Sequence, residues 1–576
     1  MVSRTAGEGG KLSYFATLVN ESMQPTPQEC LDRALGHSRW LQHRLAARAE
    51  LRDALQAELH TPCTRAEIQA LLRTFPGHPP VSDADLTRGL RLLRERIFAR
   101  VIVRDLAGLA DLAEVTRTLT ELAEETVRTA LAFHHADLAS IHGEPLDSQG
   151  QAQQLIVVGM GKLGGGELNA SSDIDLIFVF PEDGETAGPR KLDNRQFFTR
   201  LGKRLIASIN DATADGYVFR VDMRLRPYGD EGPLASSFAM LEDYFYTQAR
   251  EWERYAWIKG RALTGEPARI AELEQLRLPF VYRKYLDFGA FAAMRDLHAQ
   301  IRREVAKKDK ADNIKLGPGG IREIEFIAQV FQLIRGGQLP SLRMRPTRTL
   351  LHQLAAYHLI PEGQTAELEA AYILLRNLEH RLQYLDDAQT QMLPDGAEDR
   401  QRIAASMGHP DWERFMAVLT PLRRRVADQF EQVFGAPQAD QSEHPFAGLW
   451  RWPDDEAETV LSRAGFGDPA AALSQIRGLT GGSLFSKLPE RNQTALESLL
   501  PAFIEVCGSF ANAQDTLTRV LTLLENIARR APYLSLLKEY PQTLRQVGRI
   551  LSASPWAAQY LGRQPHLLDE LLDPRQ

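Results

Sequence analysis

Cysteine is scarce in this chain of 576 residues. The three cysteines, Cys30, Cys63 and Cys507, are odd in number and lie far apart, so they do not suggest a disulfide framework. No cluster of cysteine and histidine has the spacing of a structural zinc site. We therefore expect free thiols in a reducing compartment, which favours a cytoplasmic protein.

Long apolar runs and an excess of positive charge are also missing. No apolar run approaches the roughly 20 residues that a membrane-spanning helix needs, and residues 1–23 lack the apolar core of a signal peptide. The net charge is −7, which does not favour broad binding of DNA or RNA. A basic stretch at 302–315 is more simply a solvated helix face. We expect no membrane and no nucleic-acid partner.

The composition that remains is typical of a large globular protein. Hydrophobic residues make up 44% and charged residues 25% of the chain, and its length predicts several domains. Helical periodicity runs through 28–141 and returns after residue 346, where apolar stripes at 371–385 and 517–524 indicate buried helix faces. Residues 436–447 are polar and contain proline, as linkers do.

The segment 155–180, LIVVGMGKLGGGELNASSDIDLIFVF, carries the strongest functional signal. Two apolar runs, 155–158 and 174–180, predict buried strands on either side of a glycine-rich turn. Asp173 and Asp175 are two residues apart at the start of the second run, so both project to one face. Adjacent carboxylates repel each other unless a cation lies between them, and a glycine turn offers N–H groups to phosphate. Together these features favour metal-dependent nucleotidyl transfer.

Three other interpretations of this segment are weaker. GMGKLG fits the GxGxxG dinucleotide fingerprint, but residues 165–173 are too few for a crossover helix, and the acids lie at the wrong end of the next strand. A P-loop has serine or threonine after the lysine, where this chain has Leu163. A glycine turn with surface aspartates explains a lone DxD better than one between five glycines and a buried strand.

A third carboxylate comes from residues 217–227, YVFRVDMRLRP, whose alternation predicts a half-buried strand. Asp222 shares the polar face of this strand with Arg224 and Arg226. A solvated charged face is the simpler alternative. The functional interpretation places Asp222 beside the DxD pair, so that three carboxylates hold two divalent ions and the arginines lie near phosphate oxygens.

Three neighbouring segments complete the expected sheet region. Residues 192–211 have the pattern of an amphipathic helix, which makes a small mixed sheet plausible. The spacing in 241–261 predicts a helical core stripe, and 316–326 predicts a Gly/Pro loop that runs into a helix. The charged residues that these last two segments could bring to a site are Glu253, Lys259, Arg261, Lys315, Arg322 and Glu323.

Four stretches together resemble one family: GMGKLGGGELNASSDIDLIF, VDMRLRPYGDEGPL, REWERYAWIKGRAL and KLGPGGIREIEF. They are similar to the bifunctional glutamine synthetase adenylyltransferase/adenylyl-removing enzymes, members of the DNA polymerase β-like nucleotidyltransferase superfamily. The resemblance covers about residues 15–576. In the superfamily eleven residues separate a glycine from DxD, as they separate Gly161 from Asp173 here. Lys162 stands where the superfamily usually has serine.

The resemblance implies an α+β, mostly helical fold. A helical region at 1–140 would pack on a polymerase β-like nucleotidyltransferase domain with a small mixed sheet at 141–345. A helical bundle at 346–435, a linker at 436–447 and a helical region at 448–576 would follow. By resemblance, the last region begins the central part that receives PII-type signals.

The resemblance also implies a site and a reaction. Catalysis and the binding of Mg²⁺ or Mn²⁺, as two ions, would fall to Asp173, Asp175 and Asp222. Nucleotide and phosphate would contact Gly161, Lys162, Gly164, Gly165, Ser172, Arg224 and Arg226. The N-terminal copy in this family, which GGGELNASSDIDLIF resembles, removes AMP from a tyrosine of glutamine synthetase with orthophosphate and releases ADP. The implied partners are adenylylated glutamine synthetase and a PII-type signalling protein.

Two alternatives stay open at this point. The same site geometry can run in the forward direction, attaching AMP from ATP to the tyrosine. A regulatory module could also dock on glutamine synthetase without turnover, although the complete set of three carboxylates argues for an enzyme. No second glycine-rich DxD unit follows residue 180, and family members continue past residue 576. We therefore expect one catalytic half of a longer protein.

Overall fold

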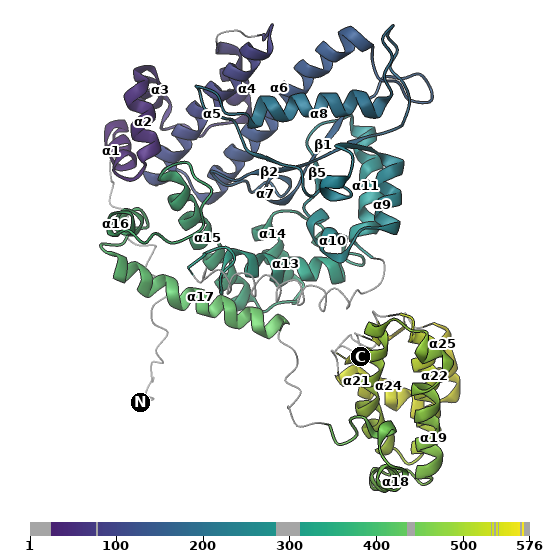
Figure 1. The fold of residues 1–576 in the computed structure, drawn as a ribbon. Helices are drawn as coiled ribbons and strands as arrows, with labels where there is room; N and C mark the ends of the chain where they lie inside the picture. Colours follow the sequence, from purple (N-terminus) through teal and green to yellow (C-terminus); the bar gives the residue numbers. More distant parts are fainter. Residues whose placement is uncertain are drawn as a thin grey trace, which may run out of the picture.

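A computed structural model describes residues 25–75, 79–283, 312–434 and 444–568, except 531–532, 535–536, 539–540 and 565–566 (Figure 1). Most of the basic stretch at 302–315 and most of the linker at 436–447 lie outside the described residues. Within them the fold is α+β and mostly helical, with one small mixed sheet, as the sequence predicts. No helix in the described ranges has the length and apolarity needed to cross a membrane.

Within the described ranges, six helices precede the sheet. They are α1 (Pro27–His37), α2 (Arg39–Ala47), α3 (Ala49–Glu58), α4 (Arg65–Thr74), α5 (Asp83–Leu106) and α6 (Leu112–His142). Five of them begin after a side chain that accepts a hydrogen bond from a backbone N–H of the first turn, which satisfies an otherwise unpaired donor. These caps are Thr26, Ser38, Thr64, Ser82 and Asp111.

The sheet has the strand order β3-β2-β1-β5, and β4 also pairs with β2. Its strands are β1 (Ile156–Gly159), β2 (Ile174–Phe180), β3 (Val221–Asp222), β4 (Ala235–Ser237) and β5 (Arg261–Ala262). β2 runs antiparallel to β1 and parallel to β3 and β4, and β1 runs antiparallel to β5. A short helix, α7 (Gly161–Gly164), connects β1 toward β2, and α8 (Asn194–Asn210) fills the predicted helical segment between β2 and β3.

Alternate residues of β1 and β2 enter two different hydrophobic cores. Val157, Leu176 and Phe178 pack with the N-terminal helices and α8. Ile156 and Ile177 pack with the opposite core, which includes residues of α9 (Phe238–Thr247), α10 (Glu251–Trp257) and α11 (Pro267–Val281). Because successive strand residues point to opposite faces, the nearly continuous apolar runs fit a sheet that is covered on both sides.

Two helical groups follow the sheet region (Figure 1). The first comprises α13 (Ile321–Arg335), α14 (Thr347–Ala356), α15 (Glu362–Tyr384), α16 (Ala397–Ser406) and α17 (Trp412–Phe434). The second comprises α18 (Asp454–Arg463), α19 (Pro469–Thr480), α20 (Ser483–Ser486), α21 (Glu490–Gly508), α22 (Ala513–Ile527), α24 (Pro541–Ala553) and α25 (Pro555–Arg563). The apolar stripes predicted at 371–385 and 517–524 are largely buried on α15 and α22.

Two local predictions need correction. The strand predicted over 217–227 is only the two residues of β3, because the carboxylate of Asp222 accepts the backbone N–H of Arg224 at 2.8 Å and turns the chain. The helical stripe predicted over 241–261 divides into α9 and α10, because Arg250 starts a new helix with Glu253 bonded back to its N–H. Trp252, which belongs to the core stripe predicted over 241–261, is 39% exposed.

Candidate active site

The structure brings Asp175 and Asp222 together at the edge of the sheet. They are directly opposite each other where β2 and β3 run in parallel. Asp173 lies just before β2, and the N–H of Ile174 donates to the carbonyl of Arg220. An open hollow of about 420 Å³ lies beside these strands. Its lining includes Asp173, Asn210, Arg220, Asp222, Arg224, Arg226 and Asp230.

The Asp175 carboxylate carries an unfavourable charge. Burial, helped by the nearby Asp222 and Asp173 and opposed by Lys315, raises its pKa to about 6. Among the described residues, no hydrogen-bond donor or ion-pair partner contacts this carboxylate. A partly buried carboxylate that faces like charges without a partner is typical of a site that receives a cation or a substrate.

Arginines neutralise the other two carboxylates. The guanidinium Nε of Arg224 lies 2.8 Å from Asp222 Oδ2, and hydrogen bonds from Arg224 hold the pKa of Asp222 below its ordinary value. Arg220 donates from Nε to Asp173 Oδ1 at 2.6 Å. Arg226, predicted to contact phosphate, donates to the carbonyl of Met223 at 2.9 Å. Both predicted phosphate arginines therefore line the hollow, but each already has a protein partner.

Gly161 allows the Asp175 carboxylate to approach the turn. It has a φ of +51°, and a Cβ at this position would lie 2.9 Å from Asp175 Oδ2. The N–H of Met160 also donates to the carbonyl of Asp175 at 2.9 Å. The glycine is therefore required both by its left-handed backbone and by the lack of space for a side chain.

The free N–H groups predicted for the glycine turn are not found at Gly164 and Gly165. Their amides donate to the carbonyls of Met160 and Gly161, at 2.9 and 3.0 Å, because the turn closes into α7. A Cβ at Gly164 would lie 2.1 Å from the carbonyl oxygen of Lys259. These glycines permit close packing of the turn, while their predicted contact with phosphate stays a prediction. Ser172 is half-buried directly before the DxD pair.

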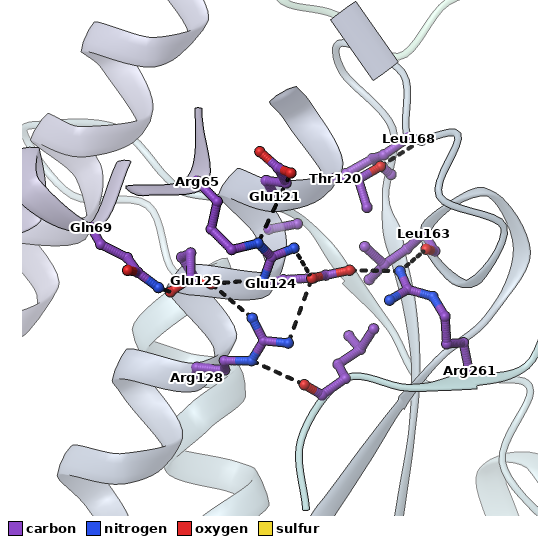
Figure 2. Close-up of polar contacts among 12 residues, drawn as sticks. Arg65, Gln69, Thr120, Glu121, Glu124, Glu125, Arg128, Leu163, Leu168 and Arg261 are labelled. Atoms are coloured by element: carbon purple, nitrogen blue, oxygen red, sulfur yellow. Dashed lines mark hydrogen bonds and ion pairs between the residues drawn. The ribbon is translucent and has the colours of Figure 1, made fainter. Parts of the chain in front are cut away.

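Arg261, on β5, forms hydrogen bonds with the glycine-rich turn (Figure 2). Its guanidinium donates to the carbonyls of Leu163 and Gly164, both at 3.0 Å, and to Glu124 of α6 at 2.6 Å. The Glu124 side chain is only 3% exposed and also pairs with Arg65. The predicted role of Arg261 in lining the site is thus replaced by a supporting one.

Three more of the charged candidates, Lys259, Glu253 and Glu323, are also structural supports. Lys259 is buried and donates to Glu167 at 2.7 Å and to Thr347 at 2.9 Å. Glu253 is buried and caps α10. Glu323 accepts the N–H of Gly319 at 2.9 Å, which secures the Gly/Pro loop before α13.

Lys162 already has an ion-pair partner. Its ammonium lies 2.7 Å from the fully buried carboxylate of Glu379 on α15. Burial lowers the pKa of Lys162, while Lys162 and Arg376 lower the pKa of Glu379. A phosphate could be contacted by Lys162 only in competition with Glu379, so this predicted contact also stays a prediction. Sequence reasoning missed Glu379 because no local pattern connects it to a residue 217 positions earlier.

The three carboxylates suit a divalent cation in their chemistry but are not preassembled around one. Carboxylate oxygens are the ligands that Mg²⁺ and Mn²⁺ prefer, and the buried charge of Asp175, repelled by Asp222 and Asp173, favours such a cation. In the described ranges, no group of three or more His, Cys, Asp or Glu side chains is arranged to hold a metal ion. Since Arg220 and Arg224 hold Asp173 and Asp222, a cation would have to compete with them.

Comparisons with known proteins identify the family. The model for glutamate-ammonia ligase adenylyltransferase matches residues 28–276, and the model for GlnD PII-uridylyltransferase matches residues 295–434. A bifunctional glutamine synthetase adenylyltransferase/adenylyl-removing enzyme of Chromobacterium violaceum is 54% identical over 96% of this chain. The chain belongs to this enzyme family.

Two further relatives carry the same name. The enzymes of Nitrosomonas eutropha and Aromatoleum aromaticum are 49% and 50% identical over 94% and 96% of this chain. The chain spans 61%, 59% and 58% of the lengths of the three relatives. Since about two fifths of each relative lies outside the match, their whole activities, substrates and partners are proposals for this chain.

Proposed function

We propose that this chain removes AMP from an adenylylated tyrosine of glutamine synthetase by phosphorolysis, giving ADP. The observation that carries the proposal is the pairing of Asp175 with Asp222 beside the Gly161 turn, at the edge of an open hollow. The relatives' name includes adenylyl removal. The segment GGGELNASSDIDLIF supports this direction because it resembles the adenylyl-removing copy of the family.

The residues around the hollow suit an anionic substrate. Arg224 is 77% exposed at its side chain, so it can exchange Asp222 for a phosphate oxygen. Arg226 and the backbone of the Gly161 turn would orient the phosphodiester. Two divalent ions, Mg²⁺ or Mn²⁺, held by Asp173, Asp175 and Asp222, would supply neutralisation of phosphate charge.

The reaction needs no strong general base. Orthophosphate is already anionic at neutral pH, and its oxygen attacks phosphorus in line with the departing tyrosine oxygen. The P–O bond to tyrosine breaks while a new P–O bond forms ADP. The leaving tyrosinate has a conjugate acid with a pKa of about 10, so nearby positive charge suffices to stabilise it. Carboxylates and arginines, rather than a catalytic histidine, therefore carry the proposed chemistry.

The domain organisation and partners belong to the same proposal. Residues 141–345 would form the catalytic domain, with 1–140 packed on it, and 346–435 and 448–576 would be helical regions joined by the linker at 436–447. A PII-type signalling protein is a proposed regulator, supported by the match of 295–434 to a PII-uridylyltransferase model. The proposed location is the cytoplasm, where glutamine synthetase and its nucleotides would be available.

The decisive assay supplies adenylylated glutamine synthetase, Mg²⁺ and orthophosphate to the chain and measures ADP. We expect ADP only when phosphate is present, and loss of product in Asp173→Asn and Asp175→Asn. Release of AMP without phosphate would show hydrolysis instead. Transfer of labelled AMP from ATP to unmodified glutamine synthetase would favour the forward reaction, and binding without either product would favour a regulatory module.

A further inference from the structure

One face of α15 contacts the loop that joins the glycine turn to the DxD pair. Arg376 donates to the carbonyl of Glu167 at 2.7 Å, and Glu379 pairs with Lys162 at 2.7 Å. One turn further, Gln383 accepts from the Asn169 side chain at 3.1 Å and from the backbone N–H of Ser171 at 3.0 Å. Residues 376, 379 and 383 are spaced three and four apart, so they lie on one side of the helix.

These contacts are buried and specific. Arg376, Glu379 and Gln383 are each 0% exposed, and a buried polar group without a partner is costly. The side-chain oxygen of Gln383 accepts both hydrogen bonds, while its amide nitrogen has no partner within the described part of the chain. Its contribution is therefore that of an acceptor for two donors of the loop.

The contact continues to the catalytic carboxylates. Asp387, just beyond α15, accepts the hydroxyl of Ser171 at 2.6 Å, and it has a φ of +54°, which is unusual for a residue with a side chain. The carbonyl of Ser171 in turn accepts from Arg220, whose Nε holds Asp173 at 2.6 Å. Hydrogen bonds through Ser171 and Arg220 therefore connect α15 to Asp173, a predicted metal ligand.

We propose that α15 is a positioning element of the active site, in which Gln383 and Glu379 fix the loop from Lys162 to Asp173. The site would then be incomplete without a helix that lies more than 200 residues later in the sequence. A shift of α15 would move Ser171 and Lys162 and would change the placement of the carboxylates. The test of this inference by kcat rests on the proposed function. The test by hydrogen exchange does not depend on the proposed function.

The test compares Gln383→Met with a matched control in the same bundle. Gln332 on α13 is also a fully buried glutamine with two hydrogen bonds, to the carbonyls of Leu342 and Met344 at 2.6 Å, but it does not contact the loop. Both methionine variants remove two buried hydrogen bonds, so similar decreases in melting temperature are expected. Gln383→Glu keeps the acceptor oxygens and serves as the rescue variant.

Two measurements decide the outcome. Hydrogen exchange at the Ser171 amide should accelerate in Gln383→Met but not in Gln332→Met or Gln383→Glu. The kcat for ADP formation should decrease at least about tenfold in Gln383→Met, with little change in KM, because a small misplacement of reacting groups lowers the rate steeply. Both kcat and slow exchange should return in Gln383→Glu.

Opposite results would overturn the proposal. Unchanged exchange at Ser171 in folded Gln383→Met would show that α15 does not fix the loop, whether or not the chain is active. Faster exchange with wild-type kcat, or an equal loss of kcat in Gln332→Met, would show that the contact is only structural. An inactive wild-type chain would refute the proposed function alone, and the exchange data would still judge the positioning. Glu379→Gln provides a second variant if Gln383→Met does not fold.

Discussion

At the scale of single residues, the site combines a strained backbone with an unfavourable charge. Gly161 adopts a left-handed conformation that places the turn against Asp175, and Asp175 carries a charge that burial disfavours. Functional sites commonly retain such features at a cost in stability. Substitution of Gly161 should therefore act through steric overlap, whereas substitution of Asp175 should act through the loss of a charge.

Gly161→Ala should lower activity at least tenfold and destabilise the fold by about 1–2 kcal/mol, since alanine is strained at a φ of +51°. The loss of activity would come from displacement of the Asp175 carboxylate, which lies 2.9 Å from the position of the new Cβ. Gly166→Ala is the matched control, because Gly166 has a φ of +73° but open space around it. Urea unfolding and the ADP assay should show similar destabilisation but a selective loss of activity in Gly161→Ala.

Asp175→Asn should abolish ADP formation without weakening the fold. The substitution removes a charge that is repelled by Asp222 and hindered by burial, so the free energy of unfolding at pH 7 should stay equal or increase. Asp428→Asn, at an exposed position on α17, is the control and should change neither property. Near wild-type turnover in folded Asp175→Asn would remove Asp175 from the catalytic set.

At the scale of secondary-structure elements, the short helix α7 depends on its neighbours. Four residues cannot form a stable helix alone, and here Arg261 binds the carbonyls at its C-terminal end while Glu124 of α6 holds Arg261 (Figure 2). β5 and α6 therefore fix the turn that carries Gly161. The support is electrostatic and largely buried, which makes it sensitive to the loss of one partner.

Arg261→Ala should destabilise the fold by about 2–4 kcal/mol, because it leaves Glu124 with fewer counter-charges and removes the hydrogen bonds that Arg261 donates to the carbonyls of Leu163 and Gly164. Chemical denaturation measures this change, and amide exchange in α7 should accelerate. The control is Arg195→Ala, whose ion pair with Asp183 at 3.5 Å is about half exposed on both sides. That pair should contribute less than about 1 kcal/mol. Equal destabilisation by Arg261→Ala and Arg195→Ala would contradict a stabilising role of Arg261 at the turn.

At the scale of the whole molecule, α15 joins the N-terminal helices to the sheet region. Besides its contacts with the loop at 162–171, it meets α1 and α5 through buried polar groups. His37 of α1 bonds to the carbonyl of Arg381 at 2.8 Å, and Arg381 pairs with Asp105 of α5. Because these groups are buried, the junction should depend on their protonation.

The contribution of His37 to stability should decrease as the pH falls below about 6.5. Burial lowers the pKa of His37 from 6.5 to about 4, so the folded state binds the proton less readily than the unfolded state does. The stabilisation is complete above pH 6.5 and is lost between pH 6.5 and 4, with a cost of about 2 kcal/mol at pH 5. His37→Gln should show a smaller difference between urea midpoints at pH 7.5 and 5. Identical differences in both proteins would contradict this assignment.

The sequence by itself determined the elements whose pattern is local. The apolar runs at 155–158 and 174–180, the amphipathic helix at 192–211 and the apolar stripes of α15 and α22 follow from periodicity, and the structure confirms them. Alternation also placed Asp222 on a strand, and the functional interpretation placed this strand beside the second run, with which it pairs in the structure. The end of this strand directly after Asp222 was not predicted, because alternation does not show that the Asp222 side chain accepts the backbone N–H of Arg224.

Only the tertiary structure decided which groups are free to act. The sequence predicts that Lys162, Arg224 and Arg226 are free to bind phosphate. In the fold, however, Lys162 pairs with Glu379 and Arg224 pairs with Asp222. Arg261, a site candidate by motif, became a support because Glu124 approaches it from α6. The burial and the ion-pair partners of a side chain depend on segments that are hundreds of residues apart in the sequence. No local pattern predicts which of these segments pack together.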